Sequence, residues 1–292
     1  MRFGEHVDIA LVMYGNISTM LRNNRFNLVI PEKHLFNSIA EIRFVRKVDR
    51  QSYTERVEFS GVPKWLDYLS VRGATRLWYT GDAIQIDFGL NHELWSGNSD
   101  WSTESEGLLC TYRGHPSTDS RVKHIDLQVA KANLREIMQK AVTHSEETLG
   151  DEYFVQHFRK ALSVLDMKES EVISHLMGAV PEEGYSLTTY QVLAGVFEGW
   201  CWWGMNDFQD IAESEEHNRI VDLLTSAMKD GVKAAVNSCE LSVDKIQKYR
   251  GAQFSPTSLS TEFMPVNEPY PRKPTRDERK EIRRTAEAQR DI

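Results

Sequence analysis

Hydrophobic and polar positions follow two different periods along this chain. Up to about residue 110 the apolar residues mostly alternate with polar ones, which is typical of half-buried strands. From His124 onward the apolar residues recur three and four positions apart, which is typical of amphipathic helices. The sequence therefore predicts an α+β protein, with a mostly antiparallel N-terminal β-sheet region followed by a C-terminal helical bundle.

The clearest local signal in the first half is a hairpin. Residues 75–80 and 83–88 flank Gly81-Asp82, a pair suited to the positive φ angles of a tight turn. Shorter alternating stretches at 41–44 and 56–59 predict two more strands. Residues 7–21 fit an amphipathic helix, with a strand over residues 9–14 as the alternative. Residues 89–123 read as long polar loops that contain one short strand at 108–112.

In the second half, an aromatic run at residues 200–208 separates two predicted helices within residues 188–238. Ser186, Thr188 and Thr189 are candidate N-caps for the first of these helices. We expect the two helices to pack together. Large aromatic side chains dominate binding hot spots, so one of Trp202 and Trp203 is a candidate anchor for a partner or a ligand. The alternative is that the aromatic run belongs to the core of the domain. Further helices are predicted over residues 127–141, 154–165 and 172–176.

These patterns divide the chain into three predicted parts. Residues 1–123 form a β-rich domain, residues 124–251 an α-helical domain, and residues 252–292 an extended or disordered Pro-rich and charged arm. The arm has too few apolar residues to build a core, so we expect it to bind a neighbouring chain. The candidate partner-binding residues in the arm are Pro265, Pro269, Pro271, Arg276, Arg279 and Arg283.

Composition narrows the class of protein. The 292 residues carry a formal net charge of −8, which argues against a surface devoted to nucleic acid or to anionic membrane. Three cysteines far apart in sequence do not suggest a disulfide framework. No apolar run has the length of a membrane helix, and the N-terminus lacks the apolar core of a signal peptide. We expect a cytoplasmic protein, or a virion protein if it is a phage component.

The densest group of candidate metal ligands is His115, Asp119, His124 and Asp126, residue types that zinc, manganese or iron accepts. The alternative is that Asp126 caps the helix that follows it. A second candidate group for acid–base chemistry is His92, Glu93 and Asp100. Long loops are common places for such chemistry, because a rigid sheet can hold them in position.

Basic residues cluster at Arg43, Arg46 and Lys47, and Arg43 and Lys47 would share a strand face that could follow phosphates. The alternative is that they keep a sheet edge soluble. The common phosphate-binding, dinucleotide-binding, zinc-protease and hydrolase motifs are missing from the sequence, and no cofactor is indicated.

The sequence therefore favours a non-enzymatic interaction protein or a structural subunit of a bacterial or phage assembly, with a protein partner or a homo-oligomer. One alternative is a metal-dependent hydrolase or nuclease that uses the loops at 92–126. Another is a toxin–immunity type of binding protein, since the turn at 203–207 and the helix that ends at Asn237 are similar to those of small bacterial proteins found beside toxins. That similarity assigns no role to any residue.

Overall fold

The structure, a computed structural model, describes residues 3–23, 30, 34–49, 54–102, 107–176, 178–182, 184–201 and 207–239. Its helices are α1 (Phe3–Asn23), α2 (Val62–Val71), α3 (Leu127–His144), α4 (Glu152–Val164), α5 (Glu169–Val172), α6 (Leu187–Gly199) and α7 (Glu215–Asn237). Its strands are β1 (Ile39–Asp49), β2 (Thr54–Ser60), β3 (Arg76–Tyr79), β4 (Ile84–Phe88), β5 (Asn91–Ser102) and β6 (Gly107–Ser117). Short turns of 3-10 or π-helix lie at Leu35–Ser38, Ser145–Leu149, Ile173–Leu176 and Phe208–Asp210.

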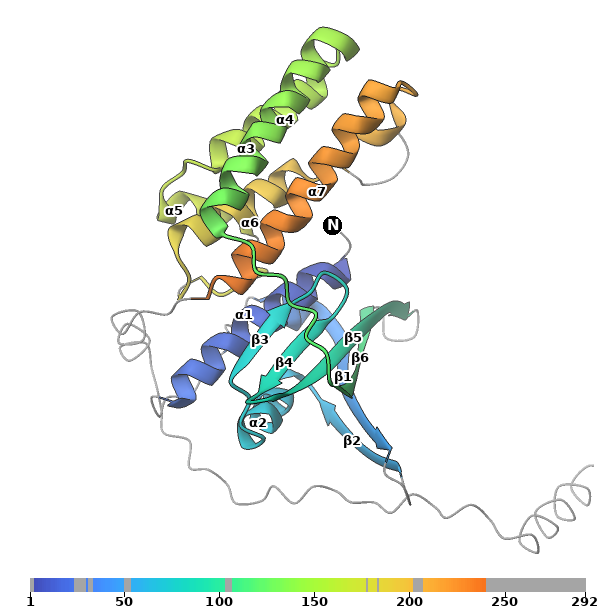
Figure 1. Ribbon diagram of the computed structural model, residues 1–292, viewed down its shortest axis with the longest axis vertical. Helices are drawn as coiled ribbons and strands as arrows, with labels where there is room; N and C mark the ends of the chain where they lie inside the picture. The colour runs from blue at the N-terminus through green and yellow to red at the C-terminus, as the bar shows by residue number, and fades with distance from the viewer. Residues whose placement is uncertain are drawn as a thin grey trace, which may run out of the picture. The chain divides into compact units, whose positions relative to one another are not determined.

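The strands form one six-stranded sheet in the order β2-β1-β6-β5-β4-β3, and the helical bundle follows it in sequence (Figure 1). All neighbouring strands are antiparallel except β1 and β6, which are parallel, so the sheet is mixed. The α+β class and the hairpin at 75–88 are confirmed, because β3 and β4 pair on either side of Gly81 and Asp82.

Helices α1 and α2 cover one face of the sheet, which we call the core face. Phe44 and Trp65 stack there with ring centroids 4.5 Å apart, and Trp95 and Tyr112 complete this aromatic layer. The opposite face, which we call the open face, carries the alternate polar side chains, among them Gln85 and Asp87 of β4.

The prediction of long polar loops at residues 89–123 is wrong. Most of this region forms the long strands β5 and β6, and the predicted short strand at 108–112 is the first half of β6. The strand alternative for residues 9–14 is also wrong, because α1 runs unbroken through them. Helix α2 was not predicted, although its buried Val62, Trp65, Leu66 and Leu69 recur at helical spacing.

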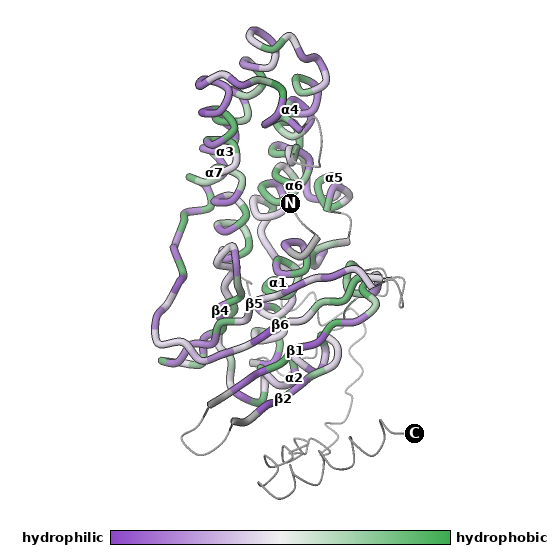
Figure 2. The backbone as a smooth tube through the Cα atoms, turned by 90° about the vertical axis from the view of Figure 1, so that its right-hand side faces the viewer, coloured by the Kyte–Doolittle hydropathy of each residue, from purple (hydrophilic) through white to green (hydrophobic). Residues whose placement is uncertain are grey.

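Helices α3, α4, α6 and α7 pack against one another as a bundle. The predicted packing of the two helices that flank the aromatic run is confirmed, since α6 contacts α7. Ser186 is the N-cap of α6, and Asp151 that of α4. Figure 2 shows hydrophobic and hydrophilic positions alternating along α3, α4 and α7, as expected of helices with one apolar side. Helix α6 is different, because its residues 189–197 are all buried.

Two asparagines close the outer edge of β3. Asn16 of α1 exchanges two hydrogen bonds with the backbone of Leu77, at 2.9 and 3.0 Å. Asn237 of α7 does the same with the backbone of Tyr79, at 2.8 and 2.9 Å. A carboxamide offers one donor and one acceptor, as a peptide group does, so each side chain substitutes for one residue of a neighbouring strand. The outward-facing N–H and C=O groups of Leu77 and Tyr79 are therefore hydrogen-bonded without a further strand beside β3.

One hydrophobic core runs through the described residues of both halves of the chain. Tyr185, next to the start of α6, donates its hydroxyl hydrogen to the backbone oxygen of Met13 in α1, at 3.1 Å. All the described residues fall within one compact unit. The division at residues 123 and 124 stays a prediction. No helix in the described part of the chain is long and apolar enough to cross a membrane.

Candidate functional site

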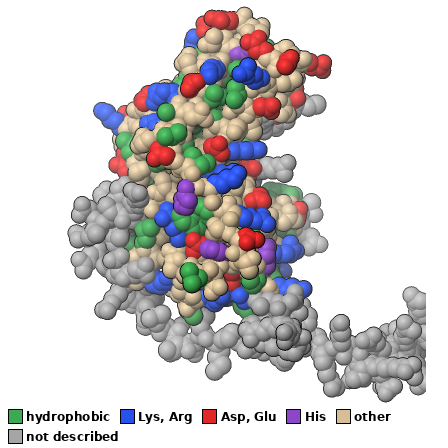
Figure 3. Space-filling view, viewed as in Figure 1, with side chains coloured by type: hydrophobic (Ala, Val, Ile, Leu, Met, Phe, Trp, Pro, Cys, Tyr) green, Lys and Arg blue, Asp and Glu red, His purple; other side chains and the backbone are tan. Residues whose placement is uncertain are grey.

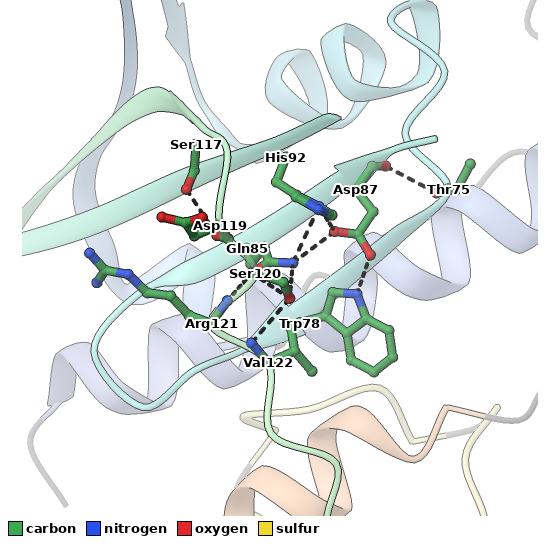
Figure 4. Close-up of polar contacts among 10 residues, drawn as sticks. All are labelled: Thr75, Trp78, Gln85, Asp87, His92, Ser117, Asp119, Ser120, Arg121 and Val122. Carbon is green, nitrogen blue, oxygen red and sulfur yellow. Dashed lines mark hydrogen bonds and ion pairs between the residues drawn. The ribbon is translucent and has the colours of Figure 1, made fainter. Parts of the chain in front are cut away.

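A polar network lies on the open face where β3, β4 and β5 run side by side (Figure 4). The Nδ1 atom of His92 is 2.7 Å from Oδ1 of Asp87. The second carboxylate oxygen of Asp87 accepts a hydrogen bond from Nε1 of Trp78, at 2.6 Å. These contacts hold the carboxylate in one orientation, and the carboxylate fixes the plane of the His92 ring.

Gln85 connects this pair to the segment that leads to the helical bundle. It is 1% exposed, and its amide nitrogen donates to Oδ1 of Asp87 at 2.9 Å and to Oγ of Ser120 at 3.2 Å. Its carbonyl oxygen accepts a hydrogen bond from the backbone N–H of Arg121 at 2.8 Å. The segment at 118–126, which we call the connector, crosses in front of β3 and β4 in Figure 1. The network therefore fastens the connector to the sheet.

The direction of the hydrogen bond between His92 and Asp87 follows from these distances. Asp87 lies closer to Nδ1 than the Gln85 nitrogen does, at 2.7 Å against 3.4 Å, and the Gln85 nitrogen is itself a donor. Nδ1 therefore carries a hydrogen and donates it to Asp87. The partners of His92 are the groups that hold the connector.

The four predicted metal ligands have separate surroundings. His115 is an exposed residue of β6, and the backbone oxygen of Asp119 accepts a hydrogen bond from Ser117 at 3.0 Å. The His124 ring meets the Trp78 ring edge to face, with centroids 5.2 Å apart. Asp126 caps α3 by accepting a hydrogen bond from the backbone N–H of Val129 at 2.9 Å. Among the described residues, no three His, Cys, Asp or Glu side chains gather closely enough to hold a metal ion.

The second predicted group does not converge either. His92 and Glu93 are neighbours in a strand, so their side chains lie on opposite faces of the sheet. Glu93 is buried on the core face and pairs with Arg46 at 2.6 Å and with Arg72 at 2.8 Å. Asp100 is eight residues beyond His92 along β5, about 27 Å at the rise of a strand.

The predicted basic cluster is divided in the same way. Arg46 serves as the partner of Glu93 on the core face. Arg43 and Lys47 are exposed together on the open face, as their spacing predicts, and Arg43 pairs with Glu41. Figure 3 shows basic and acidic side chains interspersed over this side of the sheet. The candidate anchors Trp202 and Trp203 and the candidate residues of the arm lie outside the described residues.

The structure also shows an ionisable pair that the sequence did not suggest. Oδ1 of Asp8 in α1 accepts the hydroxyl hydrogen of Tyr112 in β6, at 2.7 Å. Burial raises the pKa of Asp8 to about 7, and the charges of Glu5 and Asp82 act in the same direction, while the hydrogen bond from Tyr112 opposes them. Asp8 stands among apolar residues of α1, and the sequence carries no signal that Tyr112 lies beside it.

Glu5 and Asp82 also line a cavity of about 320 Å³ between α1, the β3–β4 turn and α7, together with Tyr79, Lys229 and Lys233. Its polar wall carries charges of both signs. The Cβ of any residue other than glycine at position 81 would meet the Lys233 side chain at 2.8 Å, so the turn approaches α7 closely.

The fold and this site define an α+β protein with a mixed six-stranded sheet that is covered on one face by α1 and α2. No known protein family, no curated protein and no solved structure matches the chain. Its function must therefore be inferred from its own residues.

Proposed function

We propose that this chain is a non-enzymatic interaction protein, a structural subunit that binds another protein chain. The observation that carries the proposal is the difference between the two edges of the sheet. Asn16 and Asn237 close the β3 edge, whereas in the described part of the chain β2 pairs with β1 alone. A strand edge with unpaired N–H and C=O groups is a template for another chain.

The ionisable residues that were candidates for chemistry support the same proposal. Asp87 and His92 belong to the network that holds the connector, Glu93 pairs with two arginines, and Asp126 caps α3. Each has a structural partner that accounts for its position. We further propose that the arm at 252–292 contributes to binding the neighbouring chain.

The mass of the native particle tests this proposal. The 33.6 kDa chain should give a particle of at least twice that mass in light scattering at micromolar concentration. A chain that ends at Gly251 keeps every described residue and lacks the arm, so any loss of mass beyond the missing residues measures the contribution of the arm. A full chain that stays monomeric at every concentration and co-purifies with no other chain would contradict the proposal.

A second candidate function, a hydrolase, rests on the Asp87–His92 pair at 2.7 Å, since a carboxylate that orients a histidine is a common general-base arrangement. Under this proposal His92→Ala should abolish turnover of ester or phosphodiester substrates, with or without added divalent metal. Under the interaction proposal, the same change should leave association with the partner chain nearly unchanged.

A further inference from the structure

We propose that the β2 edge pairs antiparallel with β2 of a second copy of this chain, about a two-fold axis that passes through Val57. This inference rests on the proposed function and specifies its partner and its surface. The two sheets would join into one continuous sheet, with the open faces of both copies on the same side.

The backbone N–H and C=O groups of β2 are oriented as such pairing requires. Gly61, just after the strand, donates its N–H to the oxygen of Ile42, at 2.9 Å. Backbone groups in an antiparallel pair point alternately toward the partner and away from it. Val57 and Phe59 therefore direct theirs toward β1, and Arg56 and Glu58 direct theirs outward. Within the described residues, no backbone hydrogen bond joins this outer side of β2 to another element.

The charges of the strand select one register. A two-fold axis must pass through a residue, because an axis between residues would set an outward-facing residue opposite one that already bonds β1. An axis through Arg56 places two arginines opposite each other, and an axis through Glu58 places two glutamates opposite each other. An axis through Val57 instead places each Arg56 opposite Glu58 of the other copy.

Both charged side chains are accessible for this pairing. Arg56 is 45% and Glu58 40% exposed, on the open face, and within one chain they already lie 2.9 Å apart. In the paired sheet the four side chains would alternate in sign across the junction. Directly opposite residues of unlike charge stabilise an antiparallel pair, and like charges destabilise it. The sequence of β2 is thus self-complementary, as an interface between identical subunits requires.

The test uses two single variants of the full chain, Arg56→Glu and Glu58→Arg. Each variant places like charges opposite each other in a homodimer, so its dimer dissociation constant should rise about tenfold or more. In a mixture of the two variants, every acidic residue of one copy again faces a basic residue of the other. The mixture should therefore form heterodimers with nearly the affinity of the parent, as detected by native mass spectrometry.

Mixing separates this interface from other effects of the substitutions. Each variant also loses the Arg56–Glu58 pair within its own chain, and mixing cannot restore an intrachain pair. Glu136→Arg is the matched control, because Glu136 is an exposed member of an ion pair with Lys140 on α3. This control should dimerise like the parent.

The possible results distinguish the two proposals. If the parent is dimeric and both single variants stay dimeric, the β2 pairing is wrong and the interaction function stands on another surface. If the variants dissociate and their mixture does not recover, the charge register is wrong. If the parent is a monomer throughout, the pairing is wrong, and only a different partner chain would support the proposed function.

Discussion

At the scale of single residues, the carboxyl group of Asp8 makes the stability of the fold depend on pH. It lies between α1 and the sheet, and burial raises its pKa to about 7. The unfolded chain gives up this proton near pH 4, so between that pH and about 7 the folded state holds a proton that the unfolded state has lost. The contribution of the protonated carboxyl to stability is therefore complete below pH 4 and is lost as the pH rises through 7.

Asp8→Asn should remove this pH dependence. Asparagine keeps an oxygen that can accept the Tyr112 hydroxyl hydrogen and carries no charge at any pH. The free energy of unfolding of the parent relative to that of Asp8→Asn should fall by a few kcal/mol between pH 4 and 8, since one pKa unit corresponds to about 1.4 kcal/mol. Burial lowers the pKa of His6 and of His34 to about 4, which raises stability over part of this range, but it does so in both proteins. Urea unfolding of both proteins across this range is the measurement. If both proteins show the same slope, Asp8 is not the titrating group.

At the scale of secondary-structure elements, the sequence predicts strands well only where apolar residues on one face alternate with polar residues on the other. The hairpin of β3 and β4 alternates clearly, whereas β5 and β6 look like loops. Trp95 lies opposite Gly114, and Tyr112 opposite Gly97, so each large ring fills the space above a glycine. A Cβ at 114 would come within 2.4 Å of the Trp95 ring. Because this packing requires glycine at positions 97 and 114, each strand lacks one apolar residue on its core face, and the alternation of apolar and polar residues is interrupted there.

The candidate site was predictable only in part, for a related reason. Aspartate is a common N-cap residue, so the alternative that Asp126 caps the following helix could be predicted from the sequence, and the structure shows this contact. The partners of Glu93, by contrast, come from β1 and the end of α2, which no spacing in the sequence connects with β5. Gln85 and Asp87 alternate with the apolar residues of β4, but the contacts of Gln85 with the connector depend on where the chain returns after β6.

The edge strand β3 gives a prediction at this scale. Asn237→Ala would leave the N–H and C=O of Tyr79 without their partner, at a cost of about 1–3 kcal/mol for each unsatisfied group that stays buried. Asn218→Ala is the matched control, because Asn218 is an exposed residue of the same helix. Thermal unfolding should show a lower Tm for the first variant and no comparable change for the second. Equal Tm values would mean that water replaces the asparagine.

At the scale of the whole described chain, the sheet and the helical bundle share packing. Asn237 and Tyr185 connect the bundle region with β3 and α1, and the connector is bonded to Gln85 along the way. The change of period near residue 124 shows where strands give way to helices. It does not show whether the core ends there, because burial of each half against the other leaves no periodic signal of its own.

This arrangement predicts a single cooperative unfolding transition for residues 1–251. A shared core makes the loss of either half expose apolar surface of the other, so an intermediate with one half folded should not accumulate. Far-UV circular dichroism follows mainly the helices, whereas tryptophan fluorescence follows both halves of the chain, through four tryptophans before residue 124 and three after it, so the two probes should give coincident urea curves. Two separated midpoints would instead show that the halves at 1–123 and 124–251 are independent domains. Gln85→Ala sharpens the comparison, since releasing the connector should lower both midpoints together if the halves unfold as one.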